Sequence, residues 1–176
     1  LGAQFLRHLS RTRVLLHLVD VMPEDGGDPI DNALAIESEL AEYSESLTER
    51  PIWLALSKVD QLEQEALDQM LDDFAEMFPD RPIYAISALG DIGLEDLVRD
   101  LMTFLTEEYL LTRENENHAE QLEALEARIT ADVWAHSERM RARRLSEVDE
   151  SADDDLDDWD VDDEDGEATE VIYVRE

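Results

Sequence analysis

A polar turn of four residues follows a short apolar run and combines a hydroxyl, an ammonium and a carboxylate. The turn consists of Ser57, Lys58, Val59 and Asp60. The apolar run, residues 52–56, is bounded by Pro51 and by this turn, as is typical of a strand buried on both faces. Lys58 is the only lysine among 14 basic residues. One lysine in a chain that otherwise uses arginine indicates a task for a flexible ammonium rather than a planar guanidinium.

The turn resembles the guanine-specificity loop of GTPases, whose usual form is Asn-Lys-x-Asp at the end of a strand. The resemblance implies that Asp60 reads the base, because guanine offers N1–H and an exocyclic amine as adjacent donors and one carboxylate accepts both. Adenine presents a different edge and would leave the carboxylate unpaired, which gives strong discrimination. The stem of Lys58 would lie along the base and the ribose, with its ammonium outside.

Ser57 is the one departure from the usual form of this loop. In the usual form, Asn reaches both the base and the phosphate-binding loop. Serine is shorter, so the departure bears on nucleotide affinity more than on base identity. Ser-Lys-x-Asp also occurs by chance where a strand ends in a polar turn, and for this turn taken alone that interpretation stays open.

A second polar turn follows the next predicted strand. It consists of Ser87, Ala88 and Leu89, and Ser87 comes 27 residues after Asp60 with one predicted helix between them. In GTPases a Ser-Ala turn lies after the strand that follows the guanine loop, and a backbone N–H of that turn meets guanine O6. Ligands of open parallel sheets bind at the carboxyl ends of strands. The two loops therefore predict a guanine-binding site at one sheet edge, where Asp20 also falls.

Strands and helices alternate along residues 14–108. Apolar runs at 14–20, 52–56 and 82–86 predict three buried strands. His17 lies inside the first run, where we expect a packed residue rather than a ligand or a base. The alternation predicts an α/β fold, with a parallel sheet and crossover helices on its faces.

An amphipathic helix is predicted after each strand. We expect Asp28 to cap the first helix with Pro29 at its first position, and Pro79 to stop the second. The three apolar stripes are Ile36, Leu40, Tyr43 and Leu47; Leu67, Met70, Leu71, Phe74, Met77 and Phe78; and Leu94, Leu97, Val98, Leu101, Phe104 and Leu105.

Longer stretches of the sequence resemble one group of GTPases in particular, the Obg family of ribosome-associated GTPases. Residues 1–20 (LGAQFLRHLSRTRVLLHLVD), 25–32 (DGGDPIDN) and 39–44 (ELAEYS) are similar to the segment that follows switch II in that family. The acidic tail, with Trp159 and a closing Val-Ile-Tyr at 171–173, is similar to that of proteobacterial members. The similarity covers nearly all of residues 1–110 and, more loosely, the tail. It implies the second half of a P-loop-NTPase-type, Ras-like G domain.

Membership would imply binding of GTP and GDP, GTP hydrolysis with Mg²⁺, maturation of the large ribosomal subunit in the cytoplasm, and a monomeric complete protein. The sequence has no Gly-x-x-x-x-Gly-Lys-Ser/Thr loop, because its only lysine is Lys58. An Asp-x-x-Gly loop before the first strand and the glycine-rich N-terminal domain of the family are also absent. We therefore expect a fragment that carries the guanine loops, contains no catalytic or metal-binding residue and does not hydrolyse GTP alone.

Charge divides the chain into a body and a tail. The net charge is −33, of which residues 146–176 contribute −15, from sixteen acids and one base. The body is therefore acidic as well and repels nucleic acid at long range, so contact with RNA requires a local basic patch. Absence of cysteine fits a reducing cytosol, and neither a signal peptide nor an apolar stretch long enough to span a membrane is present.

Three parts are expected: residues 1–110 as half of a G domain, 111–145 as a helical extension and 146–176 as a disordered acidic tail. The extension has a thin apolar stripe and ends in the densest basic cluster, Arg139, Arg141, Arg143 and Arg144. That cluster contacts ribosomal RNA phosphates, forms a charged helix face, or pairs with the acids that follow it in the chain. The alternative function for the whole chain is a non-catalytic α/β interaction module that presents the acidic tail to a basic partner.

Overall fold

The structure, a computed structural model, describes residues 8–154, with side chains described for residues 8–143. The chain divides into two compact units, Leu1–Arg139 and Met140–Glu176. The description below concerns the first unit, together with the bounds of the helix that continues into the second.

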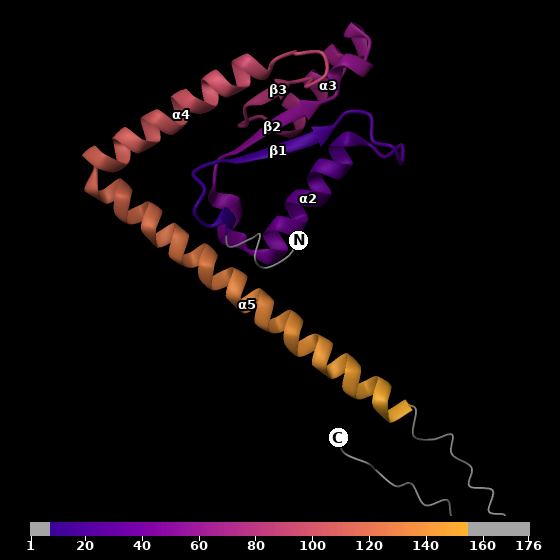
Figure 1. Cartoon of the computed structure of the whole chain (residues 1–176), viewed down its shortest axis with the longest axis vertical. Helices are drawn as coiled ribbons and strands as arrows, with labels where there is room; N and C mark the ends of the chain where they lie inside the picture. Colours follow the sequence, from indigo (N-terminus) through magenta and orange to yellow (C-terminus); the bar gives the residue numbers. More distant parts are fainter. Residues whose placement is uncertain (1–7, 155–176) are drawn as a thin grey trace, which may run out of the picture. The chain divides into compact units, whose positions relative to one another are not determined.

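A parallel sheet of three strands forms the centre of the described body. The strands β1 (Leu15–Asp20), β2 (Ile52–Ser57) and β3 (Ile83–Ala85) lie in the order β1-β2-β3. The helices α2 (Pro29–Tyr43), α3 (Gln64–Met77) and α4 (Leu94–Glu114) follow the three strands in turn (Figure 1). Two short 3-10 helices, η1 (Glu45–Glu49) and η2 (Val59–Gln61), flank β2. The predicted α/β fold with a parallel sheet is confirmed.

Helices cover both faces of β2, so its residues alternate between two cores. Leu54 and Leu56, both fully buried, pack with Ala33 of α2 and Phe74 of α3. On the other face, Trp53 and its neighbour Ala55 pack against the buried side of α4. A continuous run of apolar residues is the pattern expected for such a doubly covered strand.

The predicted apolar stripe of α2 is wrong at Ile36, which is 42% exposed. The helix begins as expected, because Asp28 Oδ1 accepts hydrogen bonds from the backbone N–H groups of Ile30 and Asp31 at 2.8 and 3.1 Å. The side of α2 that faces the body carries Ala33 and Glu37, one turn apart. Glu37 is an acid that is tolerated there because it pairs with an arginine, Arg81.

The predicted stripe of α4 is wrong at Val98, which is 55% exposed. Leu97 is buried, and Leu94, Leu101 and Phe104 pack around it against the sheet. These four positions follow one another at helical spacing and leave Val98 on the flank of the helix.

One face of β1 is left largely uncovered by the described residues. Leu16 and Leu18 are 37% and 59% exposed, although their partners in the register on β2, Trp53 and Ala55, are 6% and 0% exposed. β1 is also an edge strand. Parallel sheets are normally covered on both faces, so this surface is suited to packing against another element.

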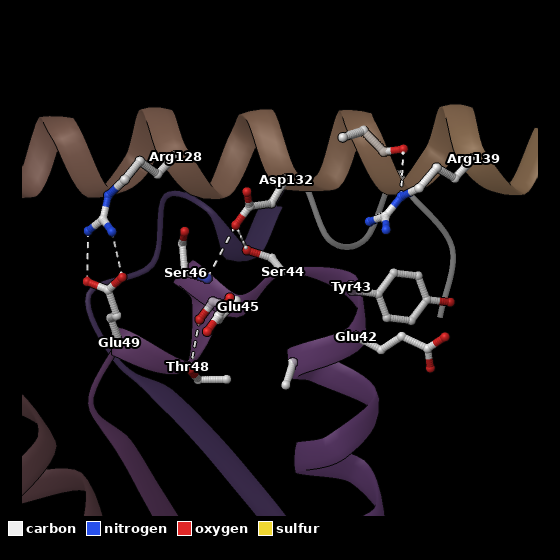
Figure 2. Close-up of a pocket in the computed structure, with 12 residues that line it drawn as sticks. Glu42, Tyr43, Ser44, Glu45, Ser46, Thr48, Glu49, Arg128, Asp132 and Arg139 are labelled. Atoms are coloured by element: carbon white, nitrogen blue, oxygen red, sulfur yellow. Dashed lines mark hydrogen bonds and ion pairs between the residues drawn. The ribbon is translucent and has the colours of Figure 1, made fainter.

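The first half of α5 (Glu116–Asp154) packs against the body, which its polar sequence did not predict. Ile129 and Val133 are 0% and 3% exposed and join Leu15, Leu47 and Ile52 in a buried cluster. Polar contacts between η1 and α5 flank this cluster and form a seam (Figure 2). In this seam, Arg128 Nη1 and Nη2 donate to the two carboxylate oxygens of Glu49 at 2.6 and 2.7 Å. Residues 116–139 therefore belong to the same compact unit as the sheet.

Beyond the first unit, α5 continues to Asp154, so residues 147–154 are helical although their charge predicts disorder. Glu147, Glu150 and Ala152 favour helix, and extending an existing helix requires no new nucleus, so the continuation is compatible with the sequence. The rest of the acidic tail, residues 155–176, and the side chain of Arg144 lie outside the described residues. Among the described helices, none has the length and apolar character needed to cross a bilayer.

Candidate functional site

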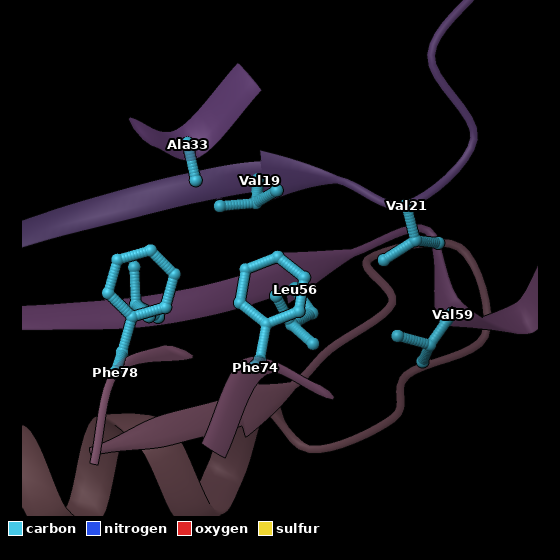
Figure 3. Close-up of a cluster of buried hydrophobic side chains, with 8 residues drawn as sticks. Val19, Val21, Ala33, Leu56, Val59, Phe74 and Phe78 are labelled. Carbon is cyan, nitrogen blue, oxygen red and sulfur yellow. The ribbon is translucent and has the colours of Figure 1, made fainter. Parts of the chain in front are cut away.

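The two predicted loops leave the sheet at the carboxyl ends of adjacent strands. Val21 and Val59, which follow β1 and β2, are each 3% exposed and lie in the core beneath this edge (Figure 3). Val59 N–H also donates to Ile86 O at 3.3 Å, which ties the first loop to the exit of β3. Burial of Val59 leaves its neighbours Lys58 and Asp60 exposed on the surface.

Lys58 has a left-handed backbone, with φ at 66°. This conformation is uncommon for a residue with a side chain and costs on the order of 1–3 kcal/mol. Among the described non-glycine residues, only Asp91 shares it, at φ 53°. Lys58 lies in the first loop and Asp91 follows Ser87 in the second, so both strained positions fall at the candidate site. Strained residues of this kind cluster at functional sites.

Lys58 is paired with the last residue of the neighbouring strand. Its Nζ donates to Asp20 Oδ2 at 2.5 Å, and Asp20 Oδ1 accepts the backbone N–H of Met22 at 2.9 Å. The hydrogen bond to Asp20 raises the pKa of Lys58. The same bond, followed by that from Met22, lowers the pKa of the Asp20 carboxyl. Both groups are therefore charged at neutral pH.

Ser57 uses its hydroxyl within the sheet. Its Oγ donates to Val19 O at 3.0 Å, and its own carbonyl accepts Val21 N–H at 3.2 Å. These bonds join the carboxyl ends of β1 and β2 at Ser57, the position at which the usual guanine loop has Asn. The serine thus ties the base loop to β1.

Asp60 and Ser87 bring the two loops into contact. The Ser87 hydroxyl donates to Asp60 Oδ1, and Ser87 Oγ itself accepts Gly90 N–H at 2.8 Å. Ser87 is 1% exposed, whereas Asp60 is exposed. A buried hydroxyl therefore orients an exposed carboxylate at the surface.

The second loop is closed on itself. Ser87 and Ile92 exchange two backbone hydrogen bonds of 3.0 Å. The loop then returns to the sheet at Gly93, where φ is 67° and a Cβ would lie 2.1 Å from Ala85 O. Only glycine fits this approach. Ala88 and Leu89 lie at the tip, and Leu89 is 94% exposed. Of the predicted second-loop residues, Ser87 is the one that contacts the first loop.

A cavity of about 680 Å³ lies away from these loops, between η1 and α5. Its polar groups are engaged with one another: Asp132 Oδ2 accepts Ser44 Oγ at 2.8 Å and Ser46 N–H at 3.3 Å (Figure 2). Burial raises the pKa of Asp132, but the hydrogen bonds from Ser46 and Ser44 outweigh burial and lower it. We therefore interpret this cavity as part of the seam that holds α5 to the body.

Among residues 8–143, no group of three or more histidine, aspartate and glutamate side chains could hold a metal ion. The described part of the chain therefore contains no such group of ligands for the Mg²⁺ that the resemblance implies. The sequence did not predict that Asp20 contacts Lys58. The feature of the sequence that could have indicated this contact is the position of Asp20 at the end of a strand, since Asp20 pairs with Ser57 in the register of β1 and β2. No protein-family model matches the chain.

Proposed function

We propose that this chain is the base-recognition half of a guanine-nucleotide-binding domain of the Obg type. The complete protein would bind GTP and GDP, hydrolyse GTP with Mg²⁺ and act in maturation of the large ribosomal subunit. The observation that carries the proposal is the hydrogen bond from Ser87 to Asp60, because it joins two loops that the sequence relates to guanine recognition.

The geometry of Asp60 suits a base with two adjacent donors. One carboxylate oxygen is held by Ser87, and the group is exposed at the strand exits, where ligands of parallel sheets bind. Lys58 lies two residues before it and offers a long apolar stem beside the same edge. Hydrogen bonds to a charged group contribute about 1.5–3 kcal/mol each, so two of them distinguish guanine from adenine clearly.

Phosphate binding requires groups that this sequence does not contain. The uncovered face of β1, with Leu16 and Leu18 exposed, and the free edge of that strand support packing against further strands and helices of the same domain. In the proposal, those elements carry the phosphate-binding loop and the Mg²⁺ ligands. This chain alone would then bind the base and the ribose without hydrolysing GTP.

Titration of the chain with guanosine, which lacks phosphate, tests the proposal directly. We expect binding in the millimolar range, equivalent to about 4 kcal/mol, with NMR shifts at the amides of Lys58, Asp60 and Gly90. Adenosine at the same concentrations serves as the control and should leave these amides unshifted. Equal shifts with both nucleosides, or no shift with either, would contradict guanine recognition and favour the non-catalytic interaction module.

A further inference from the structure

We propose that Asp20 is a positioning residue of this site, which holds the ammonium of Lys58 at the exit of β1 so that the lysine stem spans the gap between β2 and β1. The stem then forms a fixed apolar surface against which a base and its ribose pack. The role toward guanine rests on the proposed function, whereas the pairing of Asp20 with Lys58 does not.

Asp20 is a rigid anchor because both of its carboxylate oxygens are engaged. Oδ2 accepts Lys58 Nζ at 2.5 Å and Oδ1 accepts Met22 N–H at 2.9 Å. The backbone on either side is tied to β2 as well, through Ser57 Oγ to Val19 O and through Val21 N–H to Ser57 O. The carboxylate therefore has a fixed place relative to the loop that carries Lys58.

Lys58 is held at both ends of its side chain. Its backbone lies between the buried residues Leu56 and Val59 and has a left-handed conformation, and its ammonium is bound to Asp20. A flexible side chain that is ordered before a ligand arrives costs that ligand less binding free energy. Asp20 would thus raise affinity without touching the ligand.

The competing interpretation is an incidental surface pair. The two side chains are 46% and 33% exposed, and exposed pairs contribute little in general. Glu24 provides the matched control, because its charge also raises the pKa of Lys58 although the direct hydrogen bond to the ammonium comes from Asp20. Glu24→Gln removes a nearby charge, whereas Asp20→Asn removes the anchor.

Lys58 is the only lysine, so one side-chain amine reports on the pairing. We would measure the rate at which acetic anhydride modifies Lys58, by peptide mass, and the NMR signal of its Nζ. Asp20→Asn should accelerate modification and weaken guanosine binding about three- to fivefold, the scale of an exposed ion pair. Asp20→Glu should restore part of both, and Glu24→Gln should change guanosine binding little. Rising salt should bring the native chain toward the Asp20→Asn variant.

The outcomes separate the positioning role from the proposed function. Unchanged modification and NMR signals in Asp20→Asn would overturn the anchoring role. Faster modification with unchanged guanosine affinity would show that the anchor does not serve the ligand, and would overturn the positioning role while guanine recognition stands. If the native chain does not bind guanosine, the proposed function fails, and the role of Asp20 toward guanine is overturned with it.

Discussion

Asp60 and Ser87, which are 27 residues apart in the chain, are joined by a hydrogen bond from the buried hydroxyl of Ser87 to the carboxylate of Asp60. The same hydroxyl accepts Gly90 N–H at 2.8 Å. One buried oxygen therefore connects the exits of β2 and β3, and the orientation of the exposed carboxylate depends on it.

Ser87→Ala should loosen both loops. The change leaves the partly buried Gly90 N–H without its acceptor and Asp60 without its donor, which costs about 1–3 kcal/mol in the free energy of unfolding. Urea unfolding measures this loss, and guanosine affinity should fall with it. Ser38→Ala, at an exposed position of α2, is the matched control and should stay within about 0.5 kcal/mol of the native chain. Equal stability of the two variants would contradict the role of Ser87.

Asp60→Asn should exchange the base that the protein prefers. An amide cannot accept both guanine donors, but it can donate to the C2 carbonyl of xanthine. The loss for guanine is on the order of 3 kcal/mol, and xanthine nucleotides should gain affinity. Titration of the complete protein with GDP and with xanthosine diphosphate measures both changes. Asp72→Asn removes the same charge from the exposed side of α3 and should alter neither affinity. Unchanged GDP affinity in Asp60→Asn would exclude Asp60 as the base-reading residue.

Ile129→Ala should destabilise the whole body, although the residue lies in a helix that the sequence presents as a polar extension. Ile129 is fully buried against Leu15, Leu47 and Ile52, so the cavity left behind costs about 2–5 kcal/mol. Leu110→Ala on α4, where the side chain is 45% exposed, should cost much less. Both values come from urea unfolding followed by far-UV circular dichroism. A small effect at Ile129 would mean that α5 does not stabilise the sheet.

Stability should fall as pH decreases below about 6.5 because of His17. Burial lowers the pKa of His17 from its ordinary value of 6.5, although Glu37 partly opposes this and Arg81 adds to it. A lowered pKa in the folded state means that the unfolded chain binds the proton more readily, so unfolding is favoured as pH falls from 6.5 toward the folded value. Nδ1 is buried without a hydrogen-bond partner, and Glu37 Oε1 lies 3.9 Å away.

The pH dependence is measured by urea unfolding between pH 7.5 and pH 5. His17→Gln removes the titrating group and should flatten this part of the profile. His8→Gln, at an exposed position before β1, is the control and should keep the native slope. Identical slopes in the native chain and in His17→Gln would assign the dependence to other groups.

Local sequence determined the elements and their order. Apolar runs bounded by turn residues identify the three strands, and β2, the strand that is covered on both faces, has the most continuous run. Asp28 and Pro29 mark the start of α2, since capping depends on residues within one turn. The positions of the Ser57–Asp60 and Ser87–Leu89 loops follow from the ends of the strands. All of these features are set by interactions between near neighbours in the chain.

Tertiary structure decided which faces are buried and which side chains meet. Glu37 rather than Ile36 lies toward the body because Arg81, from the segment before β3, supplies the opposite charge. Lys58 meets Asp20 because the register of β1 and β2 pairs Asp20 with Ser57. Ile129 is buried because α5 returns to β1 and β2. Each of these contacts joins residues more than 35 positions apart, so their energies depend on packing that the local pattern does not contain.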